Sequence, residues 1–380
     1  MLLDSKYDEI RDMVKKFADS EVGPIAMKID HEGKIPTELI GKLAENGFLG
    51  SYIPEEFGGA GLDYLSYALL IEELSRNCAS TGVLVSAHTS LAVWPILNFG
   101  TEAQKKKYLP PMAAGELIGC FCLSEPNAGS DAGSLSTSAT DMGDHWEING
   151  VKNWITNGKE AGVCIVFAKT KKTPDYKGIS AFIVETKTPG FSIIKEEDKL
   201  GIKGSSTCQL AFDKVKVPKD ALLGEQEKGF RVAMATLDGG RIGIASQALG
   251  IAQAAFNYAA NYVTQRIQFG APLANLQGIQ FMLADMSTKI ASSRLLIYHA
   301  SALKDAGLPY SKQSAQAKLM ASESAMWVTT KAIQLCGGNG YTKEYPVERY
   351  FRDAKITEIY EGTSEVQRMV IAAAELKELK

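Results

Sequence analysis

The alternation of apolar and polar residues divides the chain into three parts, of which the first is helical. Up to about residue 118, apolar residues recur at helical spacings, as they do along the buried face of an amphipathic helix. Asp63 is placed to cap one helix, and Thr101 with Gln104 forms a capping box at another. The pattern predicts an all-helical N-terminal domain over residues 1–118.

Short runs of β-branched and aromatic residues follow, from residue 119 to about residue 225. The Asn149-Gly150 pair lies between two of these runs and is the strongest hairpin signal in the chain. No alternation of strands with helices accompanies them, which argues against a doubly wound sheet. We predict a middle antiparallel β domain over residues 119–225.

The helical period returns after Gly224 and continues to the end of the chain. Four long segments with broad apolar faces, the last from about Ser364, predict an antiparallel four-helix bundle over residues 226–380. The predicted fold class is therefore α+β, in the order helical domain, β domain and helical bundle. The longest apolar run, residues 81–100, contains Ser86, His88 and Pro95, so we interpret it as a buried core helix rather than a membrane span.

Charge and cysteine content exclude several classes of function. The formal net charge is -3, from 41 basic and 44 acidic residues that are interspersed, which argues against a nucleic-acid partner. The six cysteines form no C-x-x-C pair and the four histidines are scattered, so we predict no metal site and buried free thiols in a reducing compartment. Cys120 and Cys122 would share a strand face, but a disulfide between them is geometrically poor.

Several segments offer chemistry, although each also has an ordinary structural explanation. The chain has no G-x-G-x-x-G or Walker A sequence. The loop "LSEPNAGSDAGS" has N–H groups and hydroxyls that suit a pyrophosphate or a ring carbonyl, or it is a surface turn. In "NWITNG", Trp154 and Thr156 suit a flat heterocycle, or the segment is a half-buried strand that ends in a turn. Arg266 at a helix end suits an anion or the terminal carbonyls.

The stretch "IYEGTSEVQR" near the end of the chain raises the question of a general base. Ser364 and Gln367 have the spacing of a capping box, and a carboxylate near a helix start is favoured by the helix dipole. These ten residues alone therefore favour a helix start, and Glu361 needs support from the rest of the chain before it is assigned a catalytic role.

That support comes from the whole set of motifs in their order. The chain resembles the acyl-CoA dehydrogenase family, and most of all its short-chain, butyryl-type branch, through "LSEPNAGSD", "WITNG", "KLGIKGSS", "DKVKVPKDALLGE", "GFRVAMATLDGGRIGIASQALG", "QRIQFGAPLANLQ", "QLCGGNGY" and "RDAKITEIYEGTSEVQR". The resemblance covers essentially the whole chain. It implies a flavoprotein, a homotetramer as the usual assembly, and FAD extended between the β domain and the bundle.

The resemblance also implies site residues. Contacts to FAD are expected from Phe121, Leu123, Ser124, Gly129, Ser130, Trp154, Thr156, Gln334, Gly337, Gly338, Thr363 and Glu365. The adenine half of a neighbouring subunit's FAD is expected to meet Arg266, Phe269 and Gln277. Acyl-CoA is expected to meet Ser130, Asp238, Arg241, Tyr360 and Gly362. Trp94 and Tyr360 are bulky enough to line the acyl pocket, and they are explained equally well as core aromatics.

Glu361 falls on the family's catalytic glutamate, which removes the α proton while flavin N5 accepts the β hydride, giving the trans-2-enoyl-CoA. A related branch carries its base on the bundle helix, at the position of Gly240 here, so the competing candidate is missing. A carboxylate is a weak base in water, and burial is expected to raise its pKa. Gly362 is expected to bend the chain so that the side chain and the N–H of Glu361 address one substrate.

The resemblance implies that electrons pass to an electron-transferring flavoprotein. Three alternatives stay open: a branched or cyclic acyl-CoA as substrate, oxygen as the electron acceptor, and a catalytically silent helical assembly protein. The joint presence of Glu361, Arg266 and Thr156 argues against the last. Because the chain starts with Met1 and an acidic amphipathic segment, we expect a bacterial cytoplasmic protein, or a mitochondrial matrix protein if it is a processed eukaryotic form.

Overall fold

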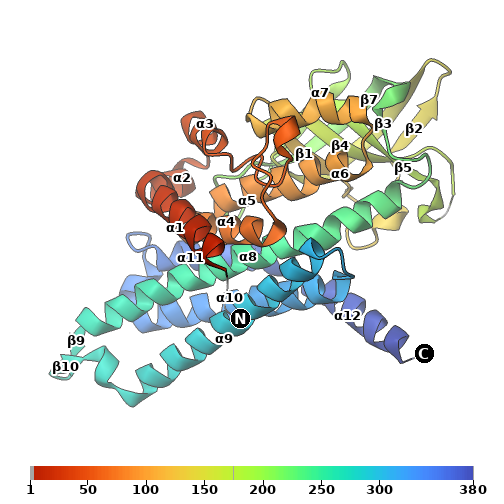
Figure 1. Ribbon diagram of the computed structural model, residues 1–380. Coiled ribbons are helices and arrows are strands. Elements are labelled where there is room, and N and C mark those ends of the chain that lie inside the picture. The colour runs from red at the N-terminus through yellow and green to blue at the C-terminus, as the bar shows by residue number, and fades with distance from the viewer. Residues whose placement is uncertain (1–3, 174, 380) are drawn as a thin grey trace.

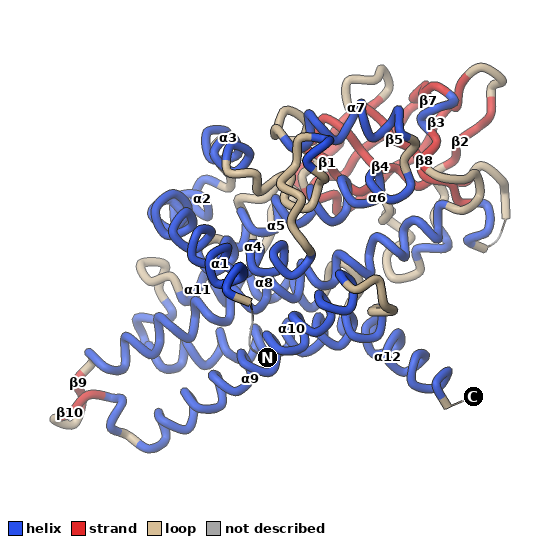
Figure 2. Tube along the Cα trace, in the orientation of Figure 1, coloured by secondary structure: helices blue, strands red, loops and turns tan. Residues whose placement is uncertain are grey.

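The computed structural model describes residues 4–173 and 175–379. Figure 1 shows a sheet at one end of the molecule, short helices packed beside it, and long helices that run away from it. The tube in Figure 2 separates the strands in red from the helices in blue, and confirms the predicted order of helical, β and helical parts along the chain.

The N-terminal part is helical, as predicted. Its α-helices are α1 (Ser5–Phe17), α2 (Ala26–Glu32), α3 (Thr37–Glu45), α4 (Tyr64–Asn77), α5 (Ala79–Ser86), α6 (Trp94–Phe99) and α7 (Glu102–Ala113). Both start signals are confirmed, because Asp63 accepts a hydrogen bond from the Ser66 N–H and the Thr101–Gln104 capping box is complete. One described segment, Ala79–Phe99, is long and apolar enough to cross a membrane, but 78% of its most apolar window is buried inside the protein, as expected of a core helix.

The middle part is a mixed sheet rather than the antiparallel sheet that we predicted. Its strands are β1 (Ile118–Cys122), β2 (Ser138–Asp141), β3 (His145–Thr156), β4 (Ala161–Lys169), β5 (Ile179–Glu185), β6 (Phe191–Glu196), β7 (Thr207–Pro218) and β8 (Leu222–Leu223). The order is β6-β7-β3-β2-β4-β5-β8, with β1 paired to β4. Most pairs are antiparallel, but β1 and β2 each pair with β4 in parallel. Strands β2 and β3 lie between β1 and β4 in the chain and provide the crossover that the parallel pair requires.

The hairpin predicted at Asn149-Gly150 is wrong. Strand β3 runs straight through this pair, and the register against β7 slips there, so that Ile148 faces Val215 but Gly150 faces Phe212. A Cβ on Gly150 would clash with the side chain of Thr137. The glycine therefore serves a β-bulge and a close approach between strands, two uses that share their sequence signal with a hairpin turn.

The C-terminal part contains the four long helices that we predicted, α8 (Gly229–Gln265), α9 (Gln277–Asp305), α10 (Ser311–Cys336) and α12 (Ser364–Glu378). A shorter helix, α11 (Val347–Lys355), follows α10, and a 3-10 turn over Ile356–Glu358 leads on to residue 361. A small hairpin of β9 (Ile267–Gln268) and β10 (Ala271–Pro272) joins α8 to α9 at the end of the molecule far from the sheet (Figure 1).

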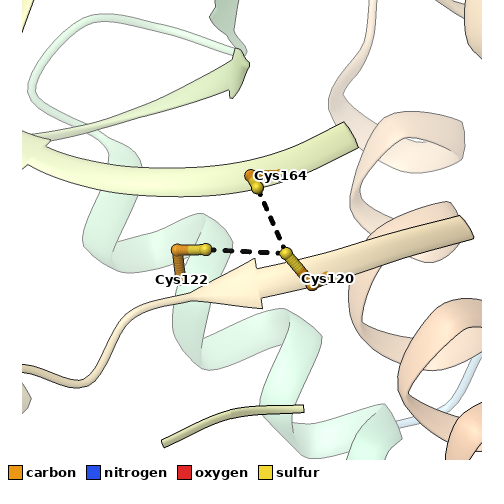
Figure 3. A group of neighbouring side chains, drawn as sticks. All are labelled: Cys120, Cys122 and Cys164. Atoms are coloured by element: carbon orange, nitrogen blue, oxygen red, sulfur yellow. Dashed lines mark hydrogen bonds between the residues drawn. The ribbon is translucent and has the colours of Figure 1, made fainter. Parts of the chain in front are cut away.

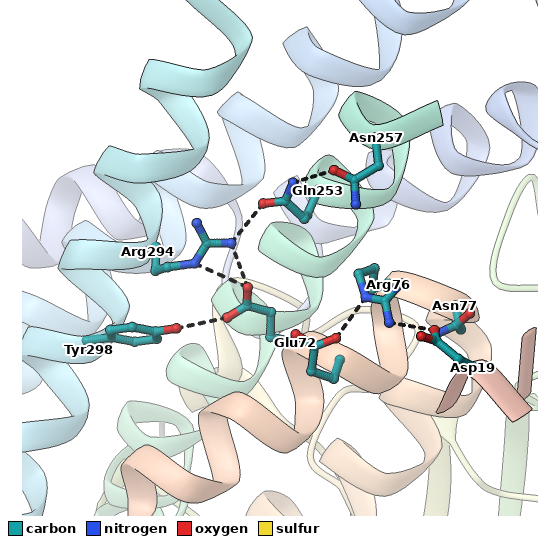
Figure 4. A network of polar contacts seen from close by, with 9 residues as sticks. Asp19, Glu72, Arg76, Asn77, Gln253, Asn257, Arg294 and Tyr298 are labelled. Atoms are coloured by element: carbon teal, nitrogen blue, oxygen red, sulfur yellow. Dashed lines mark hydrogen bonds and ion pairs between the residues drawn. The ribbon is translucent and has the colours of Figure 1, made fainter. Parts of the chain in front are cut away.

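A partly buried network of polar contacts joins α4 to the bundle and to the N-terminal segment (Figure 4). Arg294 of α9 donates to Glu72 of α4 at 2.7 Å and to Gln253 of α8 at 2.9 Å. Arg76 of α4 in turn donates to Asp19 at 2.6 Å. The Arg294 contacts fix α4 against α8 and α9, and the Arg76 contact fixes α4 to the N-terminal segment of Asp19. Helix α8 carries Gly240, which lies against Glu361.

Candidate active site

Glu361 lies in a sharp bend between the 3-10 turn and α12. Its backbone φ is 53° and that of Gly362 is 94°, so two consecutive residues adopt left-handed conformations. This conformation is easy for glycine but strained for glutamate, and such strain is concentrated at functional sites. The bend expected at Gly362 therefore begins at Glu361 itself.

The carboxyl group of Glu361 points at the backbone of α8. A Cβ on Gly240 would clash with Glu361 Oε2, and it would lie 2.9 Å from Leu91 Cδ2. Oε2 is buried and finds no hydrogen-bond partner in the described part of the chain. The glycine thus leaves the space that the carboxyl group occupies, and any larger residue at position 240 would displace it.

This environment changes the acidity of Glu361. Burial raises the pKa of Glu361 from 4.5 to about 7, and the charges of Lys318 and Arg241 keep it from rising further. A pKa near neutrality suits a group that must take a proton at physiological pH.

Arg241 and Asp238 form an ion pair one turn apart on α8, next to Glu361. The Arg241 side chain is buried, and Asp238 also accepts a hydrogen bond from Ser311 Oγ at 2.9 Å. The structure therefore brings together Glu361, Gly362, Asp238 and Arg241, four of the residues that we expected at the substrate.

The two bulky residues expected near the acyl chain have different neighbours. The Tyr360 hydroxyl donates a hydrogen bond to Gln247 Oε1 of α8. The Trp94 ring lies 4.5 Å from Lys304 Nζ, which also stands 3.9 Å from the ring of Tyr64. Burial lowers the pKa of Lys304 to about 7.

The capping box predicted for Ser364 and Gln367 is wrong by one residue. Thr363 is the N-cap of α12, and its hydroxyl accepts from the Val366 N–H at 3.3 Å. Gln367 instead donates to the Gly362 carbonyl at 2.8 Å, while the Ser364 hydroxyl is buried with no partner among the described residues. The left-handed residues 361 and 362 shift the helix start, which spacing alone does not reveal.

Lys318 is a site residue that the sequence analysis missed. It lies on the buried face of α10, and its Nζ donates to the carbonyls of Thr357 at 3.0 Å and Gly362 at 2.6 Å. Burial lowers the pKa of Lys318 to about 8. A lysine among the alanines of an apolar helix face was the available signal.

The residues expected along the flavin ring lie on β1, β3 and the loop after β1. Trp154 is 60% exposed at a kink of β3, where its φ is 61°, and Thr156 is partly exposed at the end of that strand. The Asn153 N–H donates to the Ser124 carbonyl at 2.9 Å and holds the loop against β3. Gly129 and Ser130 are exposed, whereas Phe121 packs on Phe167 with ring centroids 4.9 Å apart and Leu123 is buried.

Lys152 and Glu125 brace this loop and were also missed. The Lys152 ammonium is fully buried and donates to Glu125 at 2.8 Å and to the Leu123 carbonyl at 3.2 Å. Glu125 also accepts from the Ser136 and Thr137 N–H groups at 2.6 and 2.9 Å. These bonds fix the backbone of the loop that carries Ser124, Gly129 and Ser130.

The remaining expected residues lie on other exposed parts of the chain. Gln334, Gly337 and Gly338 are exposed at the end of α10, and Thr363 and Glu365 stand at the start of α12. Phe269 is 94% exposed at the β9–β10 hairpin, with exposed Arg266 and Gln277 beside it. Arg266 is 26 residues along from Gly240, which is about 40 Å of helix. One chain therefore does not bring the hairpin residues near Glu361.

Three cysteines meet in the sheet, although their spacing gave no metal signal (Figure 3). Cys120 Sγ lies 3.2 Å from Cys164 Sγ on the neighbouring strand and 3.7 Å from Cys122 Sγ. Thiols at these distances suit a soft metal ion by ligand type. All six cysteines are free and buried, as predicted.

Comparison with known proteins identifies the family. The acyl-CoA dehydrogenase N-terminal, middle and C-terminal domain families match residues 4–116, 120–215 and 227–376. The chain belongs to the acyl-CoA dehydrogenase family.

Relatives and solved structures agree with this assignment. The chain is 54% identical to the short-chain specific acyl-CoA dehydrogenase of Clostridium acetobutylicum, over 97% of this chain and 98% of that one. It is 53% identical to the mitochondrial short-chain specific enzyme of Rattus norvegicus, over 97% and 90%. The butyryl-CoA dehydrogenase structure from Megasphaera elsdenii superposes with a TM-score of 0.97 at 48% identity, covering 99% of both chains. A chain from a structure described as the electron transferring flavoprotein of Acidaminococcus fermentans superposes equally well, at 50% identity and 99% coverage of both.

Proposed function

We propose that this chain oxidises a short-chain acyl-CoA to the trans-2-enoyl-CoA with FAD as cofactor and Glu361 as the base that removes the α proton. The observation that carries the role of Glu361 is its buried, unpaired carboxyl oxygen against Gly240 of α8. The similarity to short-chain specific and butyryl-CoA dehydrogenases supports the substrate class.

The residues at the expected cofactor contacts fit FAD. An exposed Trp154 offers a flat apolar surface, and Thr156 adds a hydroxyl on the same strand. A Cβ on Gly129, Gly337 or Gly338 would meet no described atom within 4 Å, so a ligand can approach these backbones closely. When bound, FAD would accept the hydride that leaves the β carbon.

The chain itself would handle the proton and hold the substrate. Glu361, whose pKa is about 7, is largely available as a carboxylate at slightly basic pH. We propose that its own N–H donates to the thioester carbonyl and so makes the α proton more acidic. Asp238, Arg241 and Ser130 would lie along the CoA moiety, and Tyr360 and Gly362 would border the acyl chain.

We further propose a homotetramer in which Arg266, Phe269 and Gln277 reach the FAD of a neighbouring subunit. Their exposure, and their distance from Glu361 in one chain, support this arrangement. Electrons would pass to an electron-transferring flavoprotein, which the Acidaminococcus structure supports. The free thiols suit the bacterial cytoplasm, or the mitochondrial matrix for a processed eukaryotic form.

Anaerobic titration of the purified protein with a panel of acyl-CoA thioesters tests this proposal. We expect a yellow protein with bound FAD that butyryl-CoA bleaches at a lower concentration and faster than C8 to C16, branched or cyclic thioesters do. A protein that cannot be loaded with FAD contradicts the cofactor assignment. A loaded protein that prefers a branched or cyclic thioester contradicts the substrate class, and fast reoxidation by oxygen contradicts the proposed acceptor.

A further inference from the structure

A fully buried lysine stands behind the candidate base. The Lys318 side chain is 0% exposed and lies in the N-terminal third of α10, with Ala317 and Ala321 as buried neighbours on that helix. Burying an ammonium group costs free energy unless polar partners replace its water. The partners that Lys318 has found therefore indicate what it does.

Both partners belong to the segment that carries Glu361. Lys318 Nζ donates to the Thr357 carbonyl in the 3-10 turn and to the Gly362 carbonyl directly after Glu361. The Thr357 carbonyl lies four residues before Glu361, and the Gly362 carbonyl lies one residue after it. A single ammonium group is therefore bonded to the backbone on both sides of the bend. The Gly362 carbonyl also accepts from Gln367, whereas the side chain that donates to the Thr357 carbonyl is Lys318, from another helix.

We propose that Lys318 is a positioning residue, which holds the strained bend at residues 361 and 362 so that the Glu361 carboxyl group stays against Gly240. The inference rests on the proposed function, because it concerns the base of that reaction. It goes beyond that function by assigning to α10 a part in placing the base.

The charged and titratable groups that face Glu361 come from several elements. They are Arg241 from α8, Lys318 from α10, Tyr64 and Tyr67 from α4, and Tyr360 from its own segment. The tyrosines are neutral at physiological pH, because burial raises the pKa of each further above 10. The two cations therefore decide how well the Glu361 carboxylate is stabilised.

The two cations differ in what they contact. Arg241 is paired with the Asp238 carboxylate, which offsets its charge. Lys318 is bonded to neutral carbonyls, and Glu358 and Glu365 act on it only as nearby charges. Loss of the Lys318 charge should therefore make the Glu361 carboxylate less stable and raise its pKa.

Two substitutions separate positioning from charge. Lys318→Met keeps the length but removes both the hydrogen bonds and the charge, and Lys318→Gln keeps a donor without the charge. Lys199→Met is the control, because Lys199 is partly buried and, like Lys318, donates to a backbone carbonyl, that of Ser205, but in a different loop.

Three readouts on the FAD-loaded proteins test the inference. We expect Lys318→Met to lower kcat with butyryl-CoA about 10- to 100-fold, since small misplacements of a reacting group have effects of that order. The acid limb of kcat/KM should move to higher pH in both Lys318 variants, because Glu361 must lose its proton to act. Amide hydrogen exchange over residues 356–366 should be fastest in Lys318→Met and slower in Lys318→Gln.

The control should match the wild type in all three readouts. A Lys318→Met protein with wild-type kcat, pH profile and exchange overturns the inference, and so does a lower kcat with an unmoved acid limb and unmoved exchange. If Lys318→Met does not fold, the same outcomes are scored on Lys318→Gln. A wild-type protein that butyryl-CoA does not bleach contradicts the proposed function instead. In that case the exchange experiment still tests whether Lys318 holds the backbone of residues 356–366.

Discussion

Two buried glutamates, each near a buried lysine, behave in opposite ways in this molecule. In the β domain, Lys152 donates directly to Glu125, which also accepts two backbone N–H groups. In the bundle, Lys318 is bonded to backbone carbonyls, and Glu361 Oε2 finds no partner among the residues described. Burial raises the pKa of both, but Lys152 and the hydrogen bonds bring that of Glu125 down to about 2, while that of Glu361 stays at about 7.

The difference shows what distinguishes a structural carboxylate, Glu125, from a candidate general base, Glu361. Burial and a nearby lysine are common to both sites, so neither feature marks catalysis by itself. Direct hydrogen bonds fix Glu125 as a permanent carboxylate that holds the loop of Ser124 and Ser130. The Glu361 carboxyl group makes no such bonds within residues 4–173 and 175–379, so it can change protonation without breaking hydrogen bonds to its surroundings there.

The largest expected effect comes from Glu361→Gln. We expect turnover with butyryl-CoA to fall about 10³-fold or more, because a general base contributes about 10²- to 10⁴-fold and the amide cannot accept the proton. FAD content and acyl-CoA binding should be retained. Stopped-flow bleaching measures the effect, with Glu358→Gln as a control on a nearby glutamate that is paired with Lys355. Near-normal turnover in Glu361→Gln would show that the base lies elsewhere.

The next largest effect is expected on stability, from the Glu125–Lys152 ion pair. Glu125→Gln leaves the Lys152 ammonium buried without its charge partner, which should lower the free energy of unfolding by about 3 kcal/mol at pH 7. Because the folded pKa of Glu125 lies below 4.5, this stability is present above pH 4.5 and is lost as the pH falls towards 2. Denaturant unfolding at pH 7 and pH 4 measures both. An unchanged midpoint would contradict the brace, and Glu147→Gln on the partly exposed face of β3 should change stability by less than about 0.5 kcal/mol.

A smaller effect is expected from Gly240→Ala. The added Cβ would clash with Glu361 Oε2, so we expect a loss of turnover of about 10-fold or more. Alanine is the better helix former by about 1 kcal/mol, so stability should fall little. Gly41→Ala in α3 is the control, because its Cβ would meet no described atom within 4 Å. Full activity in Gly240→Ala would mean that the contact between α8 and Glu361 does not matter.

The smallest expected effect is on stability at the base. The folded pKa of Glu361 lies above 4.5, so the unfolded chain loses this proton first and the free energy of unfolding falls as the pH rises from 4.5 to 7. Glu361→Gln should therefore be more stable than the wild type at pH 8 by about 1 kcal/mol or more, a difference that disappears near pH 4.5. Thermal unfolding of both proteins at the two pH values checks this, and equal stability at pH 8 would contradict the raised pKa.

A local sequence motif gave a correct prediction where the motif is typical of a single local structure. Asp63 and the Thr101–Gln104 pair cap helices as predicted, because caps depend on a few adjacent residues. Asn149-Gly150 and Ser364–Gln367 misled because a bulge and a shifted helix start use the same residue types as a hairpin and a capping box. The family motifs, rather than local pattern, directed attention to Glu361.

Long-range contacts could not be predicted from the chain. Lys318 is 43 residues from Glu361, and Lys152 is 27 residues from Glu125, so only the packed fold shows which carbonyl or carboxylate each one meets. The same holds for Cys164, whose free thiol lies next to that of Cys120 across the parallel pair of β1 and β4.

The pH dependence of kcat/KM for butyryl-CoA, measured on the wild-type protein from pH 5 to pH 9, tests most directly whether Glu361 is a base tuned by burial. We expect kcat/KM to rise tenfold per pH unit at acid pH and to level off through an apparent pKa of about 7, since the free enzyme's essential base sets this limb. A profile that is flat over this range, or that levels off near the ordinary glutamate pKa of 4.5, would contradict it.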